Sequence, residues 1–60
     1  MINIGDEICV TMLPSVDIYG KKYNETGGGG TVLEIKENST IVKLFDGIVI
    51  EAKGTDFDNY

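Results

Sequence analysis

Apolar and polar residues alternate with a period of two along much of this chain, which is the pattern of β-strands that bury one face. No segment repeats its apolar residues at the period of an amphipathic helix. Glycine, proline, asparagine and aspartate separate the alternating segments, and these residues favour turns. The pattern predicts an all-β fold with strands at 6–13, 31–36, 40–45 and 48–52 and a short closing strand at 57–60.

The first predicted strand illustrates the alternation. Its apolar residues Ile8, Val10 and Met12 are expected to face the core, while Cys9 is expected on the outer face. Pro14 ends the segment, because proline has no N–H group to donate to a neighbouring strand.

A long connector at 14–30 follows this strand. It contains Tyr19 and Tyr23 together with other apolar residues, so we expect it to fold back over the core rather than to remain a disordered linker. Its last residues are expected to form a flexible loop, because glycine restricts the backbone least. These residues are Gly27, Gly28, Gly29 and Gly30.

The dipeptide Asp46-Gly47 predicts a tight hairpin with a two-residue type I′ loop, which would pair Phe45 with Ile48. In that register Ile41, Lys43, Phe45, Ile48 and Ile50 share one face, and Val42, Leu44 and Val49 share the other. Seven of the ten residues from 41 to 50 are apolar, so both faces need cover. One face is expected to line the core, and the other to lie under the connector or against a second chain.

Four short patterns combine the expected core positions with turn residues. They read Gly5-Asp6-x-Ile8-x-Val10, Gly30-x-Val32-x-x-Ile35, Val42-x-Leu44 and Asp46-Gly47. They are similar to the core pattern of KOW-type modules and of small bacterial and phage-encoded SH3-like proteins. The resemblance implies a five-stranded SH3-like small barrel in one domain, residues 1–60, with a long first loop at 14–30. KOW modules bind RNA or polymerase, so it also implies nucleic-acid binding as one function to consider.

The charge argues against that function. The chain has ten acidic and five basic residues, no arginine, and a net charge of −5, whereas nucleic-acid binders usually present a basic face. Acidity also disfavours adsorption to anionic membranes. The N-terminal residues 1–4 lack the charged and apolar regions of a secretory signal, and the chain has a single cysteine. We therefore expect a cytoplasmic protein that does not associate with membranes.

Several chemistries are excluded by composition. Without histidine the chain cannot build a Ser-His-Asp or Cys-His pair, and one cysteine cannot form a thiolate zinc site. Asp56 and Asp58 do not have the spacing of a calcium-binding loop. We expect no catalytic residue, no metal and no cofactor, and thus a protein that is not an enzyme.

Two surfaces are candidates for binding another protein. One is the connector, where Tyr19 and Tyr23 flank Lys21 and Lys22, because tyrosine offers rigid contact area at low entropic cost. The other is the outer face of the hairpin, with Ile41, Phe45 and Ile50.

The leading hypothesis is a protein-binding accessory or inhibitor module, of bacterial or phage type. A small-ligand or nucleotide-binding homo-oligomer is the alternative, since so small a core favours oligomerisation. A KOW-like nucleic-acid-binding module is the third hypothesis.

Overall fold

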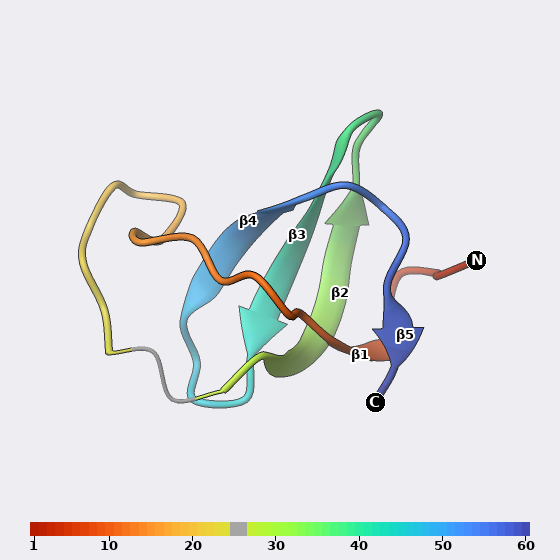
Figure 1. The fold of residues 1–60 in the computed structure, drawn as a ribbon, viewed down its shortest axis with the longest axis horizontal. Helices are drawn as coiled ribbons and strands as arrows, with labels where there is room; N and C mark the ends of the chain where they lie inside the picture. Colours follow the sequence, from red (N-terminus) through yellow and green to blue (C-terminus); the bar gives the residue numbers. More distant parts are fainter. Residues whose placement is uncertain (25–26) are drawn as a thin grey trace.

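A computed structural model describes residues 1–24 and 27–60 of the protein. These residues form five β-strands: β1 (Glu7–Cys9), β2 (Gly29–Ile35), β3 (Ser39–Leu44), β4 (Val49–Lys53) and β5 (Asp58–Asn59) (Figure 1). All ladders are antiparallel, in the order β4-β3-β2-β1-β5. The expected all-β class and the number of strands are confirmed. Among the described residues no helix is long and apolar enough to cross a membrane.

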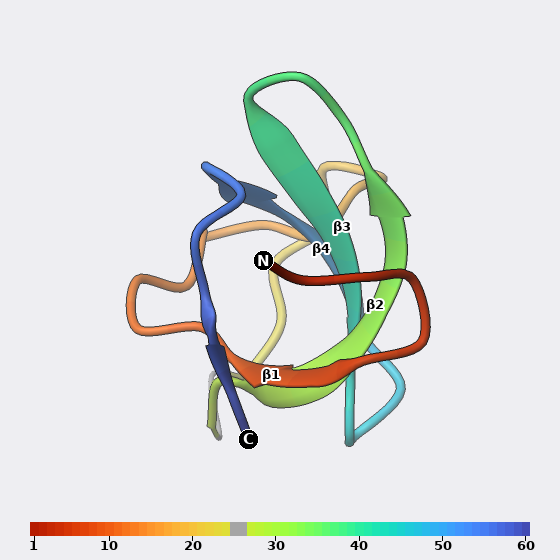
Figure 2. The same ribbon diagram turned by 90° about the vertical axis from the view of Figure 1, so that its right-hand side faces the viewer.

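The sheet curls around the core (Figure 2). Its two edge strands, β4 and β5, form no ladder with each other in the part of the chain that the structure describes, so the sheet is open there. The long first loop is confirmed, and it joins the end of β1 to the start of β2.

The first strand is shorter than the sequence pattern indicates. β1 ends at Cys9, and after Val10 the chain bends at Thr11 and Met12. The bend exposes 86% of Met12, while Leu13 packs against the core. The prediction that Met12 faces the core with Ile8 and Val10 is therefore wrong. Cys9 is exposed, as expected.

The second half of the glycine run is part of the sheet rather than of a loop. Gly29 and Gly30 are the first residues of β2 and pair with β1, so the prediction of a flexible loop is wrong for these two positions. A Cβ atom on Gly28 would overlap the carbonyl oxygen of Val10, and one on Gly30 would lie 2.7 Å from that of Lys43. Glycine is required here because neighbouring backbones approach closely.

The β3–β4 hairpin has a three-residue loop instead of the predicted two-residue loop. Leu44 N–H donates to the carbonyl of Ile48 at 2.7 Å, and Gly47 N–H donates to that of Leu44 at 2.8 Å. Gly47 has a φ of 95°, and no residue other than glycine has a positive φ in the described chain. Asp46 is thus not in the left-handed region that a type I′ turn requires, and the geometry is that of a type I turn followed by a glycine bulge.

The longer loop moves the β3–β4 register by one residue, so that Val42 pairs with Ile50 and Lys43 with Val49. Because side chains alternate, a shift by one residue turns every side chain of one strand to the opposite face. Ile50 lies in the core instead of beside Lys43, and the predicted outer face of five residues is wrong.

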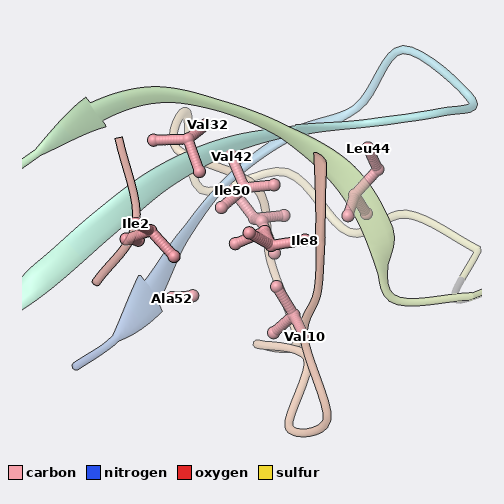
Figure 3. Close-up of a cluster of buried hydrophobic side chains, with 8 residues drawn as sticks. All are labelled: Ile2, Ile8, Val10, Val32, Val42, Leu44, Ile50 and Ala52. Atoms are coloured by element: carbon pink, nitrogen blue, oxygen red, sulfur yellow. The ribbon is translucent and has the colours of Figure 1, made fainter. Parts of the chain in front are cut away.

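Eight buried apolar residues form the core (Figure 3). They are Ile2, Ile8, Val10, Val32, Val42, Leu44, Ile50 and Ala52. One polar side chain, Thr40, is fully buried with them, and its hydroxyl donates to the carbonyl of Gly54 at 2.9 Å. This hydrogen bond offsets the cost of burying the hydroxyl.

The connector contains an ordered turn held by Asp17. One oxygen of its carboxylate accepts the backbone N–H groups of Tyr19 and Lys21, at 2.8 and 3.0 Å. The N–H of Ile18 donates to the carbonyl of Val49 at 3.0 Å, which fixes the turn to the edge of β4.

Candidate functional site

The structure gives the two tyrosines of the connector different surroundings. Tyr19 is 82% exposed on the Asp17 turn. Tyr23 packs against the core, and its hydroxyl donates to the carbonyl of Pro14 at 2.6 Å. Lys21 and Lys22 are exposed. Tyr23 therefore supports the fold, and Tyr19 is the ring that the connector presents to solvent.

The three candidate residues of the hairpin are also separated. Ile50 is 0% exposed, so it cannot belong to a binding surface in this fold. Ile41 is half-buried on the opposite face of the sheet, in register with Glu51. Phe45 is 55% exposed in the β3–β4 loop, and it is the one of the three that presents a large apolar side chain to solvent.

The ring of Phe45 lies against that of Tyr60 in an edge-to-face arrangement, with centroids 5.2 Å apart and planes at 89°. Figure 1 and Figure 2 both place the β3–β4 loop and the C-terminus at the same end of the sheet. A pocket of about 210 Å³ lies there, and we call it the aromatic pocket. Its described lining residues are Gly27, Gly29, Leu44, Phe45, Asp46 and Tyr60.

Backbone hydrogen bonds fix the main chain at both aromatic residues. The N–H of Tyr60 donates to the carbonyl of Glu7 at 2.8 Å, and the N–H of Phe45 donates to that of Gly29 at 3.1 Å. A Cβ atom on Gly29 would lie 2.7 Å from the ring of Tyr60 and 2.8 Å from that of Phe45. The rings thus pack directly on glycine backbone, and a larger residue at position 29 would displace them.

Asp46 gives the aromatic pocket its charge. Its carboxylate accepts the N–H of Ile48 at 3.2 Å, which holds the side chain at the loop. Among the described residues that line the pocket, Asp46 has the only charged side chain. The pocket therefore combines two aromatic rings with one negatively charged side chain.

A second depression, which we call the β4 groove, has a volume of about 430 Å³. It is lined by residues 10–14, Glu51, Lys53, Asp56 and Phe57. Facing residues of antiparallel strands alternate between hydrogen-bonded and non-hydrogen-bonded pairs. Because Leu44 and Ile48 form a hydrogen-bonded pair, Ile41–Glu51 and Ser39–Lys53 are non-hydrogen-bonded pairs. The backbone N–H and C=O groups of Glu51 and Lys53 consequently point away from β3, along the outer edge of β4.

Glu51, at the rim of this groove, has a lowered pKa. The hydroxyl of Ser39 donates to its carboxylate at 2.7 Å, and the ammonium of Lys36 lies 3.6 Å from the same oxygen. The hydrogen bond from Ser39 is the larger cause of the lowered pKa and the charge of Lys36 is the next.

The described residues include no group of three or more histidine, cysteine, aspartate or glutamate side chains that could hold a metal ion.

Like Leu44 and Asp46, Tyr60 lines the aromatic pocket but was not selected as a binding residue from the sequence. It closes the last predicted strand, and nothing in the local pattern relates it to a loop at position 45.

No protein-family model matches this chain, and neither a curated protein nor a solved structure matches it.

Proposed function

We propose that this chain is an SH3-like protein-binding module that acts in the cytoplasm as a non-catalytic accessory or inhibitor. The long first loop and the short β5 that pairs with β1 support the SH3-like part of the proposal. The exposed aromatic pair Phe45–Tyr60 supports the binding part, because tyrosine and other aromatic residues are enriched among the residues that dominate interface energies.

The size of the aromatic pocket favours a protein partner over a small molecule. Pockets that enclose drug-sized ligands usually have volumes of roughly 300–1,000 Å³. The aromatic pocket has about 210 Å³ and is open to solvent, which suits a single inserted side chain. The remaining contacts would come from the surface around it.

Selection from a displayed library of random peptides tests this proposal, with the folded wild-type chain as bait. We expect the recovered peptides to bind the Phe45→Ala variant at least about tenfold more weakly, since loss of a central aromatic residue costs 2 kcal/mol or more. Tyr19→Ala is the matched control, because it removes another exposed ring from a different surface. Peptides that bind wild type and Phe45→Ala equally would contradict the proposal.

The β4 groove supports a second candidate function, which is small-ligand binding. Its volume of about 430 Å³ lies within the range of ligand pockets, and Met12 and Phe57 contribute apolar side chains to its lining. A fragment screen followed by backbone amide NMR shifts tests it. Shifts at Met12, Lys53 and Phe57 that saturate are expected, and shifts confined to the aromatic pocket would contradict it.

A further inference from the structure

We propose that the aromatic pocket binds an arginine side chain of the partner. This inference rests on the proposed function and adds the chemistry that the pocket recognises. It uses three observations, which are the two rings, the carboxylate and the size of the pocket.

The rings supply the first part of the site. Phe45 is 55% exposed and Tyr60 is 74% exposed, so the contact between them leaves much of both side chains open to a ligand. Their planes stand at 89°, which gives the pocket two aromatic walls at a right angle. A guanidinium group stacks on an aromatic face and is attracted by its negative quadrupole.

The carboxylate of Asp46 supplies the second part. Asp46 lines the pocket, so a cation bound there is attracted by its negative charge, and guanidinium groups form charge-assisted hydrogen bonds with carboxylates. An acidic ligand would be repelled by Asp46 and by the net charge of −5 on the whole chain. A purely apolar side chain would gain no electrostatic attraction from Asp46.

The size of the pocket supplies the third part, since about 210 Å³ suits one inserted side chain. Gly29 places backbone rather than a side chain beneath the rings, and a Cβ atom at that position would meet both of them. The two rings thus cover the backbone of Gly29, and the open volume beside them would take a long, flat side chain. Arginine has this shape, and its guanidinium is more weakly hydrated than the ammonium of lysine.

An NMR titration tests the inference on the isolated chain. The probes are Nα-acetyl-arginine amide, the corresponding citrulline derivative, which has the same shape without the charge, and the corresponding lysine derivative. We expect the arginine probe to shift the amides of Gly29, Phe45 and Tyr60 and to bind at least about fivefold more tightly than the citrulline probe, since the neutral urea of citrulline lacks the attraction of a cation and has a carbonyl oxygen in place of one donor group. Equal shifts with citrulline, tighter binding of lysine, or no saturable shift with arginine would overturn the inference.

Two charge variants distinguish binding at the aromatic pocket from attraction to the overall negative charge of the chain. Asp46→Asn keeps the oxygen that accepts the N–H of Ile48 and removes the charge. Asp56→Asn makes the same change of net charge in the β4 groove. We expect the first to weaken arginine binding about three- to tenfold and the second to leave it within about twofold, because exposed charges at a distance are screened. An equal effect of both variants on arginine binding would contradict the proposed arginine site.

The peptide selection distinguishes failure of this inference from failure of the proposed function. If recovered peptides depend on Phe45 but retain their affinity when each arginine is replaced by citrulline, the protein-binding function stands and the arginine pocket is wrong. If no recovered peptide depends on Phe45, the function itself is wrong at this surface.

Discussion

Phe45 and Tyr60 meet edge to face with their ring centroids 5.2 Å apart, although they belong to the β3–β4 loop and to the end of the chain. The contact links a hairpin at one side of the sheet to the strand at its opposite edge, since β5 lies four positions from β4 in the strand order. The same two rings form the walls of the proposed binding site.

Because the rings contact each other, their contributions to stability should not be additive. In a double-mutant cycle of Phe45→Ala and Tyr60→Ala we expect a coupling free energy of about 0.5–1.5 kcal/mol, the range for aromatic pairs. Denaturant unfolding of the four proteins measures it. A coupling of zero would mean that the rings do not meet in solution.

The glycines near the start of β2 should differ sharply in their tolerance of alanine. Gly28→Ala places a methyl group against the backbone of Val10, so we expect a loss of roughly 1–3 kcal/mol or failure to fold. Gly27→Ala has no atom within 4 Å of the added carbon and no positive φ, and should change stability by less than about 0.5 kcal/mol. Thermal unfolding of both variants gives the comparison, and equal stability would refute the close approach.

The hairpin register predicts which isoleucine is structural. Ile50 is fully buried, so Ile50→Val should lower the free energy of unfolding by about 0.5–1.5 kcal/mol. Ile41 is half-buried on the other face, and Ile41→Val should cost less. The two-residue loop would place the side chains of Ile41 and Ile50 on the same face. Comparable losses of unfolding free energy in the two variants would therefore favour the two-residue loop over the observed register.

Glu51 should contribute stability that depends on pH. Its folded pKa lies below the reference value of 4.5, because Ser39 and Lys36 favour the carboxylate. A carboxyl group with a lowered folded pKa stabilises the fold above its unfolded pKa, and this contribution disappears as pH falls through the folded pKa. The stability difference between wild type and Glu51→Gln should therefore shrink as the pH is lowered below 4.5. Glu37→Gln serves as the control for loss of one exposed charge, and an identical pH profile for both variants would contradict the assignment.

The alternation of apolar and polar residues was sufficient to predict the all-β class and the five strands, because a period of two indicates a strand with one buried face. It failed at the hairpin because Asp46-Gly47 is compatible with loops of two and of three residues. With apolar residues on both faces, the local pattern does not choose between them. The observed register keeps Lys43 and Glu51 on the outer face while Val42 meets Ile50 in the core, and the cost of burying a charge explains that choice.

The proposed binding site was predicted only in part. Phe45 was selected as an exposed aromatic residue of the hairpin, and the structure agrees on its exposure. Asp46 was predicted only as a turn residue. Tyr60 and its packing with Phe45 on Gly29 were missed, since they depend on contacts between residues far apart in the sequence. Ile50 was wrongly included because its exposure followed from the register of the hairpin.

The location of a bound peptide tests the central claim most directly. The measurement is a set of nuclear Overhauser effects between a peptide recovered by selection and the isotope-labelled protein. The account predicts contacts from one arginine side chain of the peptide to the rings of Phe45 and Tyr60. Contacts to Tyr19, or to Met12 and Phe57 in the β4 groove, without contacts to these two rings would contradict it.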